Sequence, residues 1–324
     1  MQLLSIVVPC YNEAEGIAEF YTALKKTLVE IPKIDHEIIL VDDGSTDATA
    51  SQLKTIVQTD PCAKAVILSR NFGHQTALTA GIDYVGGDAL VMLDSDMQHP
   101  PEMIFSLVDA WQDGHDIVST IRKDTEDAGF FKTFSSKMFY WLFNLLSRTY
   151  LPVGAADFCL LSKPVYVELR QMRERHRFLR GLICWLGFNK KVIPYTAAAR
   201  NSGESKYSLR KMIRLAAEAI FSFSSKPLTI AIRMGLFLTG AGFLYVMYIL
   251  YGFFFKQNLI PGWASLICTL LILNGFQLIF IGLIGEYLSK IFEEVKGRPI
   301  YVVKELICGN ITTTHSSDQT LSIK

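Results

Sequence analysis

The amino-acid sequence predicts an α/β protein in which a mostly parallel sheet is followed by two membrane-spanning helices. In the first half of the chain, short apolar runs alternate with amphipathic helical stretches, a pattern typical of a parallel sheet with helices on both faces. Two long apolar stretches follow in the second half. The composition fits both parts, because 50% of the 324 residues are hydrophobic and only 19% are charged.

The alternation starts at the N-terminus. We expect strands at residues 4–9, 37–41, 65–68, 89–93 and 116–120, with helices that include 13–29 and 75–84. The run 89–93 lies between Gly87 and the pair Pro100-Pro101, so it is expected to be a buried central strand.

Two carboxylates, Asp94 and Asp96, directly follow this central strand. Ligands of parallel sheets collect at the carboxyl ends of the strands. Mg²⁺ and Mn²⁺ are typically held by one or two carboxylates together with substrate phosphates. The pair therefore indicates a metal site for a nucleoside diphosphate, although a D-x-D pair alone is about as often a solvated turn.

The stretch 230–255 contains a single charge, Arg233, and 263–285 contains none, so each is long enough to cross a hydrocarbon core of about 30 Å. Basic residues flank their outer ends, whereas the connection 256–262 holds only Lys256. By the positive-inside rule both termini are cytoplasmic. No cleavable signal peptide is expected, because the apolar run 3–8 is too short.

Two further segments, at about 131–148 and 208–228, have one apolar and one basic or polar face, as interfacial helices do. Packing against the sheet is the alternative. The expected organisation is a domain at 1–207, a juxtamembrane helix at 208–228, a two-helix region at 229–290 and a C-terminal segment at 291–324. Its last part, 309–324, is rich in Thr and Ser and is expected to be disordered.

Composition also excludes some functions. A net charge of +1 argues against nucleic acid as a partner. The six cysteines show no C-x-x-C spacing, so zinc is not indicated and the thiols are expected to be reduced. Two apolar membrane spans and two amphipathic helices offer surfaces for self-association, so a homo-oligomer is plausible.

The D-x-D stretch continues as QHPPE and is one of six ordered sequence blocks. The others are IVVPCYNE at 6–13, VDDGSTD at 41–47, SRNFGHQTALTAGID at 69–83, GAADFCLL at 154–161 and RNSGESKYSLRKM at 200–212. Together these blocks resemble the polyprenyl-phosphate glycosyltransferases of glycosyltransferase family 2, which include bactoprenol glucosyltransferases and dolichol-phosphate mannose synthases. The resemblance spans about the first 300 residues.

The resemblance implies a Rossmann-like GT-A catalytic domain and assigns roles to individual residues. Asp94 and Asp96 would hold Mg²⁺ or Mn²⁺, and Asp157 would be a third catalytic carboxylate that orients the sugar or acts as a base. The implied nucleotide-binding residues are Pro9, Tyr11, Glu13, Asp42, Asp43, Gln98 and Arg122. The implied lipid-phosphate-binding residues are Arg200, Ser205, Lys206, Arg210 and Lys211.

The expected reaction is inverting transfer of a sugar to a polyprenyl phosphate by an integral plasma (inner) membrane enzyme whose catalytic domain is cytoplasmic. The preferred pair is UDP-glucose and undecaprenyl phosphate. UDP-GlcNAc, UDP-galactose, or GDP-mannose with a dolichol-type phosphate remain alternatives, as does a membrane-tethered sugar-nucleotide sensor. A processive polysaccharide synthase would be expected to carry a Q-x-x-R-W motif, which the sequence lacks. A nucleotidyltransferase would need a Gly-rich loop after the first strand, where the chain has VPCYN.

Overall fold

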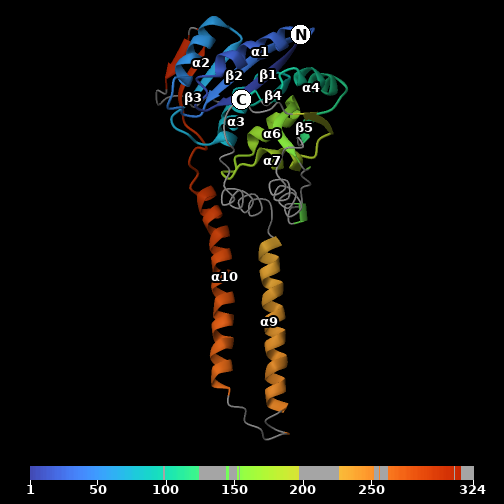
Figure 1. Ribbon diagram of the computed structural model, residues 1–324, viewed down its shortest axis with the longest axis vertical. Helices are drawn as coiled ribbons and strands as arrows, with labels where there is room; N and C mark the ends of the chain where they lie inside the picture. Colours follow the sequence, from blue (N-terminus) through green and yellow to red (C-terminus); the bar gives the residue numbers. More distant parts are fainter. Residues whose placement is uncertain are drawn as a thin grey trace. The chain divides into compact units, whose positions relative to one another are not determined.

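The computed structural model describes residues 1–97, 99–123, 144–145, 152, 154–196, 226–251, 255, 262–309 and 311–314. The chain divides into two compact units. The first comprises Met1–Asn144, Thr149–Lys211 and Arg298–Lys324, and the second comprises Leu145–Arg148 and Met212–Gly297. The first unit contains the sheet, and the second contains two long helices (Figure 1).

The nine described strands form one sheet in the order β7-β5-β6-β4-β1-β2-β3-β8-β9. Their bounds are β1 (Gln2–Cys10), β2 (Ile34–Asp42), β3 (Ala63–Leu68), β4 (Ala89–Met92), β5 (Ile117–Lys123), β6 (Ala155–Ser162), β7 (Lys190–Thr196), β8 (Val303–Cys308) and β9 (Ile311–Thr314). The central strands β4, β1, β2 and β3 are parallel. On one side β6 inserts antiparallel between β4 and β5, and on the other β8 pairs antiparallel with β3.

Helices cover both faces of the sheet, as the alternation predicts (Figure 1). On one face α1 (Ile17–Val29), α2 (Thr49–Thr59) and α4 (Met103–Gln112) share a core with the strands. For example, α1 buries Ile17, Phe20 and Leu24 at helical spacing. The buried side chains of α3 (His74–Asp83), α6 (Lys163–Gln171) and α7 (Leu179–Trp185) lie outside that core and pack on the other face.

The strand register sets the position of the candidate site. In the parallel pairs Cys10 lies beside Asp42, and Val7 lies beside both Ile39 and Met92. The carboxyl ends of β1, β2 and β4 therefore meet at one edge of the sheet. The loops that follow these strands carry most of the residues that the sequence singles out.

The segment after the second long helix returns to the sheet as β8 and β9. Glu305 on β8 forms an ion pair with Lys54 at 2.6 Å, and the Tyr301 hydroxyl donates to Asp83 at 2.5 Å. The expectation of a disordered tail from residue 309 is thus wrong for Ile311–Thr314, because the strand β9 pairs with β8. Residues 315–324 lie outside the described part.

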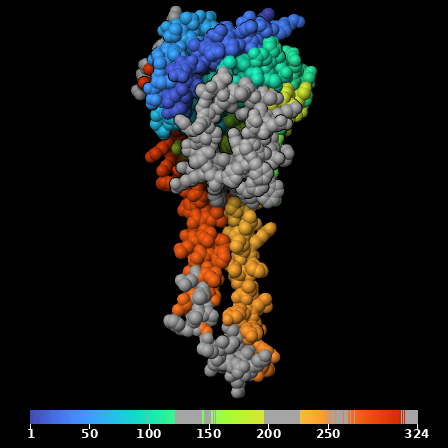
Figure 2. Space-filling model, viewed as in Figure 1, coloured from blue at the N-terminus to red at the C-terminus, as the bar shows by residue number. Residues whose placement is uncertain are grey.

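The second unit contains α9 (Lys226–Tyr251) and α10 (Trp263–Val295). Both are long and apolar enough to cross a membrane, with mean hydropathies of 1.7 and 1.4 over their candidate spans. Large apolar side chains such as Phe237 and Leu278 are 75% and 69% exposed. On the face drawn in Figure 2, side chains of both helices are visible at the surface. Lipid would cover such surfaces.

The two expected interfacial helices lie outside the described residues, apart from Asn144 and Leu145 and the start of α9. Their position at a membrane surface therefore stays a prediction.

Candidate functional site

Asp94 and Asp96 lie in the loop that leaves the carboxyl end of β4, as the sequence predicts. The Leu93 amide donates to the Val7 carbonyl at 3.0 Å, which continues the pairing of β4 with β1. Ser95 between the two carboxylates donates to the Pro9 carbonyl at 3.3 Å. The D-x-D loop is thereby fixed to the end of β1, and the Asp94 side chain remains 29% exposed.

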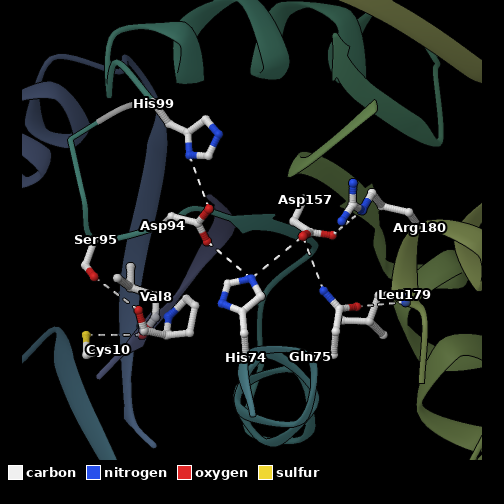
Figure 3. A network of polar contacts seen from close by, with 11 residues as sticks. Val8, Cys10, His74, Gln75, Asp94, Ser95, His99, Asp157, Leu179 and Arg180 are labelled. Atoms are coloured by element: carbon white, nitrogen blue, oxygen red, sulfur yellow. Dashed lines mark hydrogen bonds and ion pairs between the residues drawn. The ribbon is translucent and has the colours of Figure 1, made fainter. Parts of the chain in front are cut away.

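Two imidazole rings face Asp94 (Figure 3). His74 Nε2 lies 3.5 Å from Asp94 Oδ1, and His99 Nδ1 lies 3.6 Å from Asp94 Oδ2. His99 packs against Phe158 and Tyr195, with ring centroids 5.1 and 5.6 Å away. Burial raises the pKa of Asp94, and the two histidines act in the opposite direction. Both rings are placed to neutralise this carboxylate when they are protonated.

Asp157 on β6 lies on the far side of His74 from Asp94 (Figure 3). His74 Nε2 is 3.7 Å from Asp157 Oδ2, so a single ring nitrogen lies near both carboxylates. Arg180 Nε lies 3.0 Å from Asp157 Oδ1, and Gln75 Nε2 donates to Oδ2 at 3.2 Å. Burial acts to raise the pKa of Asp157, but Arg180, His74 and Gln75 lower it to about 2.

The pKa of His74 is shifted in the other direction. Burial of the ring lowers it, but the two neighbouring carboxylates, Asp157 and Asp94, outweigh that effect and raise it. The structure thus brings Asp94 and Asp157 together around one histidine. Their catalytic roles stay predictions.

The expected nucleotide residues Asp42 and Asp43 are buried and bonded within the protein. Asp42 accepts from the Ser45 amide at 3.2 and 3.3 Å, which closes the turn after β2. Asp43 accepts from the amides of Phe72 and Gly73 at 2.7 and 2.9 Å. Burial raises the pKa of both carboxyl groups, although these amide donors lower it. Asp43 therefore fixes the loop that leads to His74, and contact with a nucleotide stays a prediction.

Tyr11 and Glu13 lie in the loop after β1, close to the loop after β2. The Glu13 amide donates to Thr49 Oγ1 at 2.9 Å, and the Asn12 amide donates to Ser45 Oγ at 2.9 Å. Tyr11 is 45% exposed at this edge of the sheet. A flat, exposed aromatic ring at the carboxyl end of β1 can stack on a nucleobase, as the prediction for Tyr11 requires.

Several predicted site residues cannot be placed. Arg122 belongs to the backbone of β5, but its side chain lies outside the described part. The other residues in this group all lie outside it, and they are Gln98, Arg200, Ser205, Lys206, Arg210 and Lys211.

The structure places four further side chains around the carboxylates, to which no sequence pattern assigned a role: His74, Gln75, His99 and Arg180. A signal existed for the first three, because they lie in blocks that carry the family resemblance. Arg180 lies in none of these blocks. Only the packing of α7 against β6 brings it to Asp157.

Asp94 and Asp96 fit a site for Mg²⁺ or Mn²⁺. Carboxylate oxygens are the ligands that these hard cations prefer, and such ions usually bind one or two protein carboxylates plus substrate phosphates. Within the described residues, no three His, Cys, Asp or Glu side chains are close enough to form a metal site by themselves. The donor set thus suits an ion that is completed by a diphosphate.

Comparison with known proteins identifies the family. Residues 5–169 match Glycosyl transferase family 2. The chain is 40% identical over 301 residues to the uncharacterized glycosyltransferase YkcC of Bacillus subtilis, with 93% of each chain covered. It is 37% identical over 307 residues to the SfII prophage-derived bactoprenol glucosyl transferase of Shigella flexneri, covering 95% of this chain and 99% of that one. The chain belongs to glycosyl transferase family 2 and is a glycosyltransferase related to the bactoprenol glucosyl transferases.

Solved structures with a similar fold include glucosyl-3-phosphoglycerate synthase from Mycobacterium tuberculosis in complex with Mn²⁺, UDP and phosphoglyceric acid. Its TM-score is 0.48 at 20% identity, with 68% of this chain and 76% of that chain covered. TarS of S. aureus in complex with UDP-GlcNAc has a TM-score of 0.45 at 19% identity, with 69% and 68% covered. The predictions of family, enzyme class and fold are confirmed: a mostly parallel GT-A sheet is followed by two long apolar helices.

Proposed function

We propose that this protein transfers a sugar from a nucleoside diphosphate sugar to a polyprenyl phosphate, with glucose from UDP-glucose and undecaprenyl phosphate as the preferred pair. The observation that carries the proposal is the similarity to bactoprenol glucosyl transferases over 95% of the chain. It includes the two apolar helices as well as the domain that contains Asp94 and Asp96.

The chemistry of the acceptor needs little help from a base. The second ionisation of a phosphate monoester lies near pH 6, so its oxygen is already negatively charged at neutral pH. In the proposed reaction this oxygen forms a bond to the anomeric carbon while the bond between that carbon and the diphosphate oxygen breaks. Attack from the face opposite the leaving group inverts the carbon.

Asp94 and Asp96 would hold Mg²⁺ or Mn²⁺ near the diphosphate. The ion, when bound, would neutralise the charge that develops on the leaving group. Asp94 is positioned for this role by the tie from Ser95 to β1 and by His74 and His99 on its two sides. Asp157, which lies one imidazole ring away, is the carboxylate proposed to act at the sugar.

The acceptor side of the proposal concerns basic residues that precede the first apolar helix in the sequence. Arg200, Lys206, Arg210 and Lys211, together with Ser205, can pair with a lipid phosphate whose tail remains in the bilayer. Lys206→Ala should impair transfer to lipid by about ten- to a hundred-fold while nucleotide binding stays largely intact. Loss of nucleotide binding alone would move Lys206 to the donor side.

The protein is proposed to be an integral inner-membrane protein with its catalytic domain and both termini in the cytoplasm. The support comes from α9 and α10, which are long and apolar enough to span a bilayer, and from the basic residues at their outer ends. Self-association through these helices is a further proposal, and nucleic acid is not an expected partner.

A donor screen tests the choice of sugar. Radiolabelled UDP-glucose, UDP-GlcNAc, UDP-galactose and GDP-mannose are each incubated with the purified protein and undecaprenyl phosphate. We expect labelled lipid chiefly from UDP-glucose. A product from another sugar would correct the donor but keep the reaction class. Nucleotide-sugar binding without any lipid product would favour the sensor alternative.

A further inference from the structure

The carboxylate of Asp157 is held on both oxygens by side chains from two different helices (Figure 3). Arg180 on α7 reaches Oδ1 at 3.0 Å, and Gln75 on α3 donates to Oδ2 at 3.2 Å. The side chain of Asp157 is only 13% exposed. A largely buried carboxylate with an ion pair on one oxygen and a hydrogen bond on the other has little freedom to rotate.

Gln75 is itself fixed in one orientation. Its Oε1 accepts from the Leu179 amide at 2.9 Å, so its Nε2 must face Asp157. Leu179 is the first residue of α7, where amide groups lack partners within the helix. Gln75 therefore joins the first turns of α3 and α7, and Arg180 is the next residue after the joined amide. This connection fixes the backbone from which the Arg180 side chain extends.

The second oxygen of Asp157 also faces His74, whose Nε2 is 3.7 Å from it and 3.5 Å from Asp94 Oδ1. Among the described residues, the charged groups around Asp157 are thus Arg180 from α7, His74 from α3 and, beyond the ring, Asp94 after β4. This places Asp157 beside the D-x-D loop, where the sugar of a bound donor would lie.

We propose that Arg180 is a positioning residue for the sugar transfer: with Gln75 it holds the Asp157 carboxylate in place beside the anomeric carbon, where the carboxylate would stabilise positive charge. The inference rests on the proposed function for the identity of the reaction. The attacking phosphate oxygen carries no proton that Asp157 would need to remove. A fixed negative charge instead favours a transition state in which the anomeric carbon becomes oxocarbenium-like.

A double-mutant cycle tests whether Arg180 works through Asp157. The turnover number is measured for the full-length wild type, Arg180→Met, Asp157→Asn and the double variant. We expect Arg180→Met to lower turnover by about ten- to a hundred-fold, with the KM for the nucleotide sugar changed less than about threefold. The turnover number of the double variant should lie within about twofold of that of Asp157→Asn, because the guanidinium has no further effect once its carboxylate is gone.

The matched control breaks another arginine–carboxylate pair in the same segment. Arg173 donates to both oxygens of Asp83 at 2.7 and 3.0 Å. Arg173→Met should have an effect that multiplies with that of Asp157→Asn. If Arg180→Met fails to fold, as judged by its melting temperature, Arg180→Lys takes its place in the cycle, since lysine cannot present a planar guanidinium to the carboxylate.

Two results would overturn the inference: multiplicative effects of Arg180→Met and Asp157→Asn on turnover, or an effect of Arg180→Met confined to the KM. Failure of the proposed function looks different, because the wild type would then form no lipid product. The same cycle can be measured on the slow release of UDP from UDP-glucose in the absence of lipid, so that Arg180 is tested independently of the acceptor.

Discussion

Replacing Gly44 by alanine should push apart the loop after β2 and the loop after β3. The candidate site requires these two loops to be in contact. Gly44 follows β2 with φ of +66°, and an added Cβ would lie 2.2 Å from the carbonyl carbon of Arg70 and 2.6 Å from its Cα. These are backbone atoms, so they cannot rotate away. Asp43 binds the Phe72 and Gly73 amides next to this contact. A separation of the loops would therefore also strain these hydrogen bonds.

The expected loss of stability in Gly44→Ala has two parts. An alanine in the left-handed region costs about 1–2 kcal/mol. Loss of one hydrogen bond to the charged Asp43 adds roughly 1.5–3 kcal/mol. The free energy of unfolding should thus fall by about 2.5–5 kcal/mol, which lowers the melting temperature of a domain of this size by about 5–20 °C.

Gly187 provides the matched control, because its φ is +73° but the nearest atom to an added Cβ is the Trp185 carbonyl oxygen at 4.0 Å. Gly187→Ala should cost only the backbone part, about 1–2 kcal/mol. Melting temperatures are measured by tryptophan fluorescence for both purified variants in one detergent. Equal melting temperatures would refute the argument that the Gly44–Arg70 contact holds the loops.

Three further predictions concern the site and the membrane. Asp94→Asn, Asp96→Asn or EDTA treatment should each lower transfer by about 10²-fold or more, and full activity in EDTA would contradict the metal site. Because the pKa of Asp157 is lowered to about 2, its ionised form and the stability that it contributes should be lost only as the pH falls toward 2. In a His74→Gln background, which removes the neighbouring imidazole whose pKa Asp157 raises, the ratio of turnover with and without Asp157→Asn should therefore stay constant between about pH 6 and 8, whereas a tenfold change would show titration of Asp157 itself. A cysteine placed at Asn258 should react with a membrane-impermeant thiol reagent from outside the cell and one at Gly309 should not, and the reverse pattern would overturn the orientation.

Much of the central sheet could be predicted from the sequence, because its signals are local. The run that forms β4 is apolar at every position and buried on both faces of the sheet. The D-x-D pair therefore had to lie at a strand end. The two long apolar helices were equally clear, because length and hydropathy alone define them.

The edges of the sheet could not be predicted in the same way. The insertion of β6 between β4 and β5 depends on the pairing of Met92 with Cys159, which lie far apart in the sequence. Likewise β8 pairs with β3, although both long helices lie between these two strands in the sequence. A run of a few apolar residues does not specify its partner strand, so such long-range pairings leave little signal in a single sequence.

The contacts within the candidate site were equally hard to predict from the sequence. Asp43 follows a strand, but no sequence pattern shows that both of its oxygens accept backbone amides from the loop before His74. Arg180 has no motif of its own, and its contact with Asp157 depends on the packing of α7. Motifs identified the carboxylates and the blocks that contain His74, Gln75 and His99, whereas the contacts among these groups and with Arg180 were visible only in three dimensions.

Sugar transfer to a lipid phosphate can be measured directly in one reconstitution. Purified wild-type protein and Asp94→Asn are incubated with radiolabelled UDP-glucose and Mg²⁺ or Mn²⁺, with or without undecaprenyl phosphate, and the organic phase is counted. Label should enter the organic phase only when wild-type protein and lipid phosphate are both present. Equal label without the lipid phosphate, or with Asp94→Asn, would contradict this prediction.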